Sequence, residues 1–133
     1  MMKYAAAYAA TLVALIMLDL LWLGMVARPL YREGIGHLMA ENADLKAALV
    51  FYLFYVSGLL YFGLRPNASK PGLISAARGG ALAGLFVYAS YDLTNMAVLK
   101  NWPLGLALID MAWGTFVSAV ATATGKFAYD RIA

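Results

Sequence analysis

Four long apolar stretches constrain the fold of this 133-residue chain more than any other feature. A helix needs about twenty mostly apolar residues to cross the hydrocarbon core of a bilayer. Every backbone polar group in lipid must be satisfied within the protein, and a helix does this within a single stretch. The sequence therefore predicts an all-α fold: an integral membrane four-helix bundle forming one domain, 1–133, with four transmembrane spans at approximately residues 4–27, 47–64, 73–99 and 102–125.

The composition agrees with a membrane protein and excludes several kinds of site. Charged residues make up 13% of the chain and hydrophobic residues 64%, and that charged share is about half of what soluble domains carry. The absence of cysteine excludes disulfides, iron–sulfur clusters and cysteine nucleophiles. A single histidine, His37, leaves little room for a histidine-rich metal centre. The basic residues are spread along the chain rather than clustered, which disfavours nucleic-acid binding.

The distribution of basic residues predicts the orientation of the spans. Asp19 interrupts the first apolar stretch and no small-x-small cleavage site follows it, so we expect a retained span rather than a signal peptide. Cytoplasmic loops carry an excess of Lys and Arg. A cytoplasmic N-terminus would place six basic residues inside (Lys3, Arg65, Lys70, Arg78, Lys126 and Arg131) and four outside (Arg28, Arg32, Lys46 and Lys100). This difference predicts that both termini are cytoplasmic, with an inverted or dual topology as the alternative.

Three predicted spans each contain one aspartate, namely Asp19, Asp92 and Asp110. A charged side chain inside a bilayer is costly, so each is a functional hypothesis by default. Each lies seven or eight residues in from one end of its span, which is roughly 10–12 Å from the same membrane face. That face carries the loop 28–46. We therefore predict a single polar site that binds a proton, a cation or a small ligand.

The residues near the aspartates indicate which other side chains would belong to this site. Trp22 and Trp113 each follow an aspartate by three residues, which places Trp and Asp on one helix face, so we expect the indoles to form pocket walls. Tyr88, Asp92 and Asn95 follow an i, i+4, i+7 stripe and could orient the carboxyls. The alternative is that the aspartates only tie helices together, at about 1 kcal/mol per hydrogen bond. The predicted binding residues are Asp19, Asp92, Asp110, Asn95, Tyr88, Trp22 and Trp113.

Weaker patterns lead to further expectations. Small residues every four positions, as at Gly80 and Gly84, favour close helix packing, and a second such stripe consists of Asp110, Gly114, Ser118 and Thr122. Residues 35–44 could form an interfacial helix, and its acidic side chains with His37 would cover the aspartates. The aromatic residues of the second span are expected to face lipid. A carboxylate metal site is chemically possible, but we predict no metal, and the pattern identifies no cofactor.

Four sequence strings resemble a known family. They are Asp19-x-x-Trp22-Leu23-Gly24, Phe51-Tyr52-x-x-Tyr55-x-x-Gly58, Tyr91-Asp92-Leu93-Thr94-Asn95-x-Ala97 and Asp110-x-x-Trp113-Gly114. Together they resemble the small bacterial membrane proteins grouped as domain-of-unknown-function family 2177, over nearly the whole chain. The resemblance implies a multi-pass bacterial inner-membrane protein of four spans. It also implies that the Asp, Trp and Asn positions belong to the recurring motifs of that family.

Three classes of function fit these features. The first is a carrier or pore for a proton, a cation or a small solute, which would need a homodimer to enclose a path. The second is a non-catalytic accessory or assembly subunit of a larger membrane complex. The third is an intramembrane enzyme acting on a lipid or isoprenoid. We rank it last because the chain has no nucleophile motif, phosphate-binding glycine loop or cofactor fingerprint. A non-enzymatic role is favoured, no catalytic residue is predicted, and membrane lipids are the expected surroundings.

Overall fold

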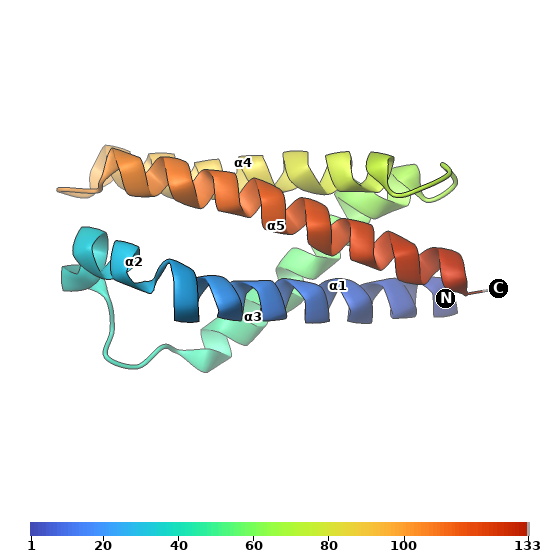
Figure 1. Ribbon diagram of the computed structural model, residues 1–133, viewed down its shortest axis with the longest axis horizontal. Helices are drawn as coiled ribbons and strands as arrows, with labels where there is room; N and C mark the ends of the chain where they lie inside the picture. Colours follow the sequence, from blue (N-terminus) through green and yellow to red (C-terminus); the bar gives the residue numbers. More distant parts are fainter. Residues whose placement is uncertain (133) are drawn as a thin grey trace.

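The computed structural model describes residues 1–132, which are mainly helical with no strand among them. The all-α prediction is confirmed. The principal helices are α1 (Met2–Leu21), α2 (Arg28–Ile35), α3 (Leu45–Gly58), α4 (Ile74–Val98) and α5 (Leu104–Arg131), as drawn in Figure 1. Two π-helical segments, η1 (Trp22–Val26) and η3 (Leu59–Leu64), continue α1 and α3. Two short 3-10 turns, η2 (Gly36–Leu38) and η4 (Arg65–Asn67), complete the list.

Three helical segments of the described chain are long and apolar enough to cross a membrane, namely Met2–Val26, Leu45–Asn67 and Leu104–Arg131. They correspond to the first, second and fourth predicted spans. The third predicted span forms α4, which at 25 residues is long enough but less apolar. Polar side chains such as Arg78, Asp92 and Asn95 interrupt it.

Local sequence explains where several helices begin. The Asp44 carboxylate accepts a hydrogen bond of 3.1 Å from the Ala47 backbone N–H and caps α3, which satisfies a donor that the first helical turn leaves free. Between α4 and α5 the chain turns at Asn101, which has a φ of 61°. Asparagine adopts this left-handed conformation more readily than most residues. The short turn makes α4 and α5 an antiparallel pair.

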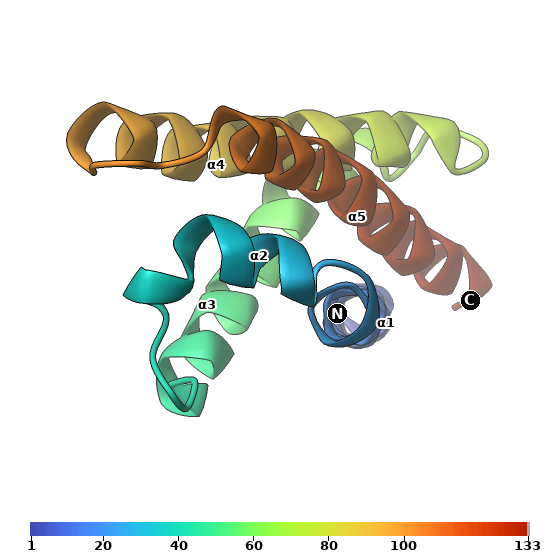
Figure 2. The same cartoon turned by 60° about the vertical axis from the view of Figure 1, so that its left-hand side comes forward.

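The helices α1, α4 and α5 run along the long axis of the molecule, and α5 packs against both of the others (Figure 1). The two termini lie at the same end, where the rings of Tyr4 and Tyr129 pack edge to face with centroids 5.1 Å apart. The α3 helix packs on α1 and slants away from α4, whereas its continuation η3 packs on α4 (Figure 2). The seam between α3 and α4 is therefore open at the α3 end.

Small residues allow α4 and α5 to approach closely, as the stripes in the sequence predicted. A methyl group added at Gly80 would lie 2.6 Å from the Ser118 carbonyl oxygen, and one at Gly84 would lie 2.6 Å from the Ser118 Cβ. Both distances are well inside van der Waals contact. Glycine is therefore required at both positions for this helix spacing.

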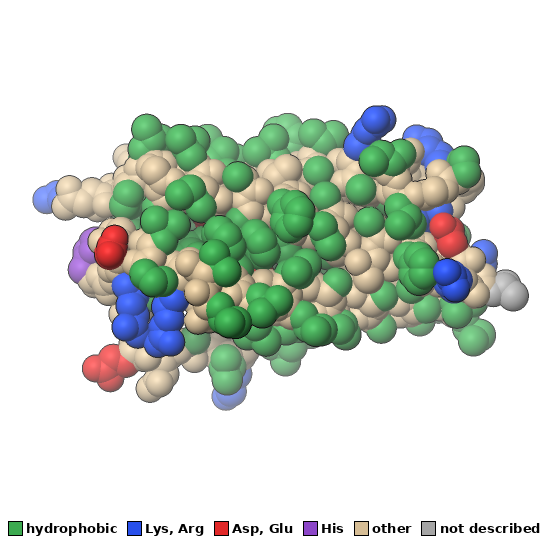
Figure 3. Space-filling model, viewed as in Figure 1, with side chains coloured by type: hydrophobic (Ala, Val, Ile, Leu, Met, Phe, Trp, Pro, Cys, Tyr) green, Lys and Arg blue, Asp and Glu red, His purple; other side chains and the backbone are tan. Residues whose placement is uncertain are grey.

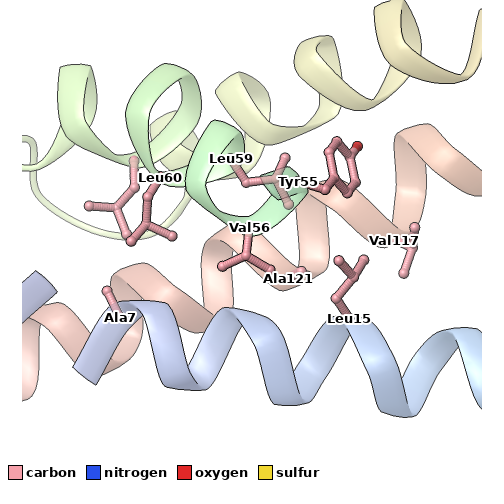
Figure 4. Packing of buried hydrophobic residues seen from close by; sticks show 9 residues of the cluster. Ala7, Leu15, Tyr55, Val56, Leu59, Leu60, Val117 and Ala121 are labelled. Carbon is pink, nitrogen blue, oxygen red and sulfur yellow. The ribbon is translucent and has the colours of Figure 1, made fainter. Parts of the chain in front are cut away.

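An apolar cluster fills the centre of the bundle. Figure 4 shows Leu15 of α1 facing Val117 and Ala121 of α5, with Val56 of α3 and Leu59 of η3 packed beside them. All five side chains are fully buried. Lipid chains are as apolar as these side chains, so in a membrane the cluster stabilises the bundle through close packing rather than through exclusion of water.

The outer surface agrees with immersion in a membrane. Figure 3 shows hydrophobic side chains over the middle of the visible face, with most of the Lys, Arg, Asp and Glu side chains towards the two ends of the long axis. Large hydrophobic side chains such as Phe54, Phe86 and Phe116 are exposed. An apolar belt between two charged ends is the surface that a bilayer solvates.

The expected interfacial helix at residues 35–44 is wrong. The loop helix is α2, which begins at Arg28 and ends at Ile35. Pro29 occupies its first turn, where the missing backbone N–H costs nothing, so the proline starts this helix rather than only ending the previous one. The expected lid is also wrong: His37 and Glu41 are exposed, and the Asp44 side chain caps α3.

Candidate functional site

A pocket of about 370 Å³ lies at the end of the bundle that carries α2. All five principal helices or their continuations contribute to its wall. The lining consists of two aspartates, seven aromatic residues and two aliphatic ones: Asp19, Trp22, Leu23, Tyr31, Phe51, Tyr52, Val87, Tyr88, Tyr91, Asp110 and Trp113. Within residues 1–132 no lysine, arginine or histidine lines it. The pocket is therefore acidic and aromatic.

Asp19 is held by donors from two other helices. The indole Nε1 of Trp113 donates to its Oδ1 at 3.0 Å, and the Tyr52 hydroxyl donates to its Oδ2 at 2.7 Å. The side chain is only 6% exposed. Both donors are neutral, so they orient the carboxylate without cancelling its charge.

Asp110 is held by a donor from α2. The Tyr31 hydroxyl donates to the Asp110 Oδ1 and accepts a long hydrogen bond of 3.4 Å from the Trp22 Nε1. Burial, together with the hydrogen bond to this carboxylate, raises the pKa of Tyr31 above its ordinary value. Tyr31 therefore stays protonated at neutral pH and remains a donor. Through this contact α2 closes one side of the pocket.

The repeated Asp-x-x-Trp motif forms a reciprocal arrangement. Trp113, which follows Asp110 on α5, donates a hydrogen bond to Asp19 on α1. Trp22, which follows Asp19, donates a hydrogen bond to the Tyr31 hydroxyl, and that hydroxyl donates to Asp110. The two indoles stack on each other with centroids 4.4 Å apart and planes 4° from parallel. Because α1 and α5 run in opposite directions, the same motif on each helix places its tryptophan beside the aspartate of the other.

Asp92 lies near Asp110, but no hydrogen bond joins the two carboxyl groups in the described part of the chain. Asp92 is 1% exposed and does not line the pocket. Neither of its carboxyl oxygens has a hydrogen-bond partner in the described part of the chain. The site thus consists of a pocket with Asp19 and Asp110 in its wall and a third, buried carboxyl group, that of Asp92, outside the lining.

A family model described as "Predicted membrane protein (DUF2177)" matches residues 4–127. The chain belongs to the DUF2177 family. No curated protein matches the chain, and no solved structure does. The match includes every residue that lines the pocket, so the site lies wholly within the part of the chain that the family shares.

Tyr88 and Asn95 lie differently from the aspartates they were expected to orient. Tyr88 lines the pocket and its ring lies against Gly114. Asn95 is half-buried and outside the pocket lining. No side-chain hydrogen bond joins either residue to an aspartate within residues 1–132.

The donors to the pocket aspartates that sequence reasoning missed are Tyr31 and Tyr52. Tyr31 was assigned to a loop, and Tyr52 to the lipid-facing surface. One signal could have found Tyr52: a buried carboxylate needs donors, and the second span offers tyrosines at the right depth.

The three aspartates of this DUF2177 protein do not form a metal centre in the structure. No group of three or more His, Cys, Asp or Glu side chains that could hold a metal ion occurs in the described residues. Asp19 accepts hydrogen bonds from Trp113 and Tyr52, and Asp110 accepts one from Tyr31, so the two pocket carboxyl groups have separate partners.

Proposed function

We propose that this protein binds a small organic cation in the acidic aromatic pocket and acts as a proton-coupled carrier in a bacterial inner membrane. One observation carries the proposal: the pocket wall contains two aspartates and seven aromatic rings but no basic side chain among the described residues. Such a wall has a strong preference for the sign of charge on its ligand.

Electrostatics support a cation as the ligand. A buried carboxylate without a counter-charge is costly in the low dielectric of a membrane protein. A cation between Asp19 and Asp110 would neutralise charge that only neutral donors contact at present. The faces of Trp22, Trp113 and the pocket tyrosines add cation–π attraction, which ranges from about 0.5 kcal/mol at exposed sites to about 2 kcal/mol when desolvated. Quaternary ammonium groups suit such aromatic walls best.

The burial of Asp92 close to Asp110 supports proton coupling. Two adjacent carboxylates repel one another strongly when both are ionised, and no basic side chain of the described chain pairs with either. In the absence of ligand the pair is best stabilised when one of the two carboxyl groups is protonated. A cation at Asp110 would take over this role and release the proton. Cation binding and proton release would then be linked, as a carrier requires.

We further propose a single domain of four spans with both termini in the cytoplasm. The α4 helix lies antiparallel to α5 over much of its length (Figure 1), which supports a fourth crossing despite its polar residues. The end that carries the termini holds the larger group of basic residues, and Lys and Arg favour the cytoplasmic side. The pocket would then open towards the outer face.

Single-cysteine labelling tests this topology, because the native chain has no cysteine. We expect Glu41→Cys, in the loop before α3, to react with a membrane-impermeant maleimide added outside spheroplasts. Lys70→Cys, in the loop before α4, should react only after the membrane is permeabilised. Labelling of Lys70→Cys from outside would contradict the proposed orientation. Labelling of both variants from the same side would contradict the crossing between them.

Binding of choline, used as a small quaternary ammonium probe, tests the pocket. Isothermal titration in maltoside micelles should show choline binding, and its neutral isostere dimethylbutanol should bind at least tenfold more weakly. Asp19→Asn should weaken choline binding at least tenfold, because it removes a charge while leaving the shape of the side chain. Choline binding should also release a proton, measured as a dependence of the heat on the buffer.

The control for this experiment is Asp44→Asn. Asp44 caps α3 outside the pocket, and asparagine caps a helix as well as aspartate does. It should therefore bind choline with unchanged affinity. Equal choline affinity in Asp19→Asn, Asp44→Asn and the native protein would contradict the proposed cation site.

A further inference from the structure

An apolar groove continues from the pocket along the seam between α3 and α4. It has a volume of about 260 Å³. Phe51 and Val87 line both the pocket and the groove, so the two spaces adjoin. The rest of the groove is lined by Phe54, Tyr55, Gly58, Phe62 and Ala83.

The course of α3 explains why the groove exists. This helix packs on α1 and slants away from α4 (Figure 2). At Gly58 a methyl group would meet no atom within 4 Å, so the space beside this residue is open. Phe54 is 77% exposed and Phe62 67% exposed at the rim. In a bilayer this opening would face lipid chains rather than water.

We propose that the ligand is a single-chain amphiphile with an ammonium head group, whose head lies in the acidic pocket and whose alkyl or prenyl chain lies in the groove. The inference rests on the proposed cation site and adds the chemical class of its ligand. The head group would contact Asp19 and Asp110, and the chain would leave between Phe51 and Val87. The ligand would thus enter sideways from the membrane.

The charge of the pocket and the size of the groove select this occupant. A phosphate head group would be repelled by the two pocket carboxylates and would find no cation in the described lining. A groove of about 260 Å³ takes part of one extended chain, whereas a partner helix is about 10–12 Å across with its side chains. An ammonium amphiphile fits both spaces, with its charged head group in the pocket and its chain in the groove.

The groove is expected to act as an exit for the chain rather than as a source of affinity. Lipid and detergent chains are as apolar as the groove, so moving an alkyl chain between them gains little. Longer chains alone would therefore be a poor test. Blocking the groove is a better one, because a bound head group whose chain has no exit must be expelled.

The experiment compares choline with dodecyltrimethylammonium in maltoside micelles, where the neutral detergent head does not compete for the aspartates. Ala83→Phe fills the groove from α4. Ala97→Phe adds the same bulk at an exposed position of the same helix, outside the groove. We expect Ala83→Phe to weaken binding of the long-chain cation at least tenfold and to leave choline binding unchanged. Ala97→Phe should change neither.

The outcomes separate the two proposals. If choline binds in an Asp19-dependent way but Ala83→Phe leaves dodecyltrimethylammonium binding unchanged, or weakens both cations equally, the groove proposal is overturned and the cation site stands. If the native protein binds neither cation, both proposals fail. Unchanged choline affinity in Ala83→Phe also shows that this variant is folded. Gly58→Leu fills the groove from the opposite wall and should give the same selective loss.

Discussion

Replacing Gly84 by leucine is expected to lower the free energy of unfolding by about 3 kcal/mol or more. Inserting bulk into a closely packed contact typically costs 1–3 kcal/mol and sometimes more. Even a methyl group at this position would lie 2.6 Å from the Ser118 Cβ on α5, so the larger leucine forces α4 and α5 apart. In a membrane this close packing is a main source of helix association. Unfolding by SDS in mixed micelles measures the loss.

Gly58→Leu is the matched control for this change. It has the same increase in volume and the same gain in helix propensity, about 0.8–1 kcal/mol relative to glycine, but its side chain enters open space. We expect its stability to equal or exceed that of the native protein. Similar stabilities for the two variants would show that the α4–α5 seam does not require glycine.

Replacing Trp113 by phenylalanine is expected to lower the free energy of unfolding by about 2 kcal/mol. The change keeps an aromatic ring against Trp22 but removes the indole N–H that donates to Asp19 at 3.0 Å. A hydrogen bond to a charged group contributes about 1.5–3 kcal/mol, and a buried carboxylate that loses its donor is costly. Tyr52 remains as the other donor to Asp19. The same SDS titration measures the effect.

Trp22→Phe provides the comparison for the indole hydrogen bond. Its N–H reaches only a neutral hydroxyl, that of Tyr31, over a long 3.4 Å, and its ring takes part in the same stack. We expect a loss below about 1 kcal/mol, since neutral hydrogen bonds contribute about that much at best geometry. A larger loss for Trp22→Phe than for Trp113→Phe would mean that the stack, rather than the carboxylate contact, stabilises this end of the bundle.

The sequence predicted the helices well because lipid imposes simple rules on length and polarity. Apolar stretches fixed the four long helices to within a few residues at most ends, and the small-residue stripes correctly indicated the α4–α5 contact at Gly80 and Gly84. The sequence-based prediction failed in the loop 28–46, where the rules on span length and polarity do not apply. There Arg28-Pro29 could end one helix or begin the next, and in the structure it begins α2, whose Gly34 lies close to Leu106 at the start of α5.

In the candidate site, too, some features could be predicted from the sequence and others depended on the tertiary structure. The sequence by itself predicted three acidic groups at one depth, because residue counting along a helix gives depth directly, and Asp19 and Asp110 do line one pocket. It also determined that Trp22 and Trp113 would share faces with Asp19 and Asp110. Counting residues does not give the rotation of one helix about its axis relative to its neighbours. Tertiary structure alone therefore decided which groups meet.

The partners of each carboxyl group follow from that rotation. Asp19 contacts Trp113 and Tyr52, and Asp110 contacts Tyr31. Asp92 lies near Asp110 but outside the pocket lining. The slant of α3, which opens the groove, depends likewise on how its apolar surface packs on α1. Apolar residues on almost every face of these helices leave many rotations open, and only close packing of the whole bundle selects one of them.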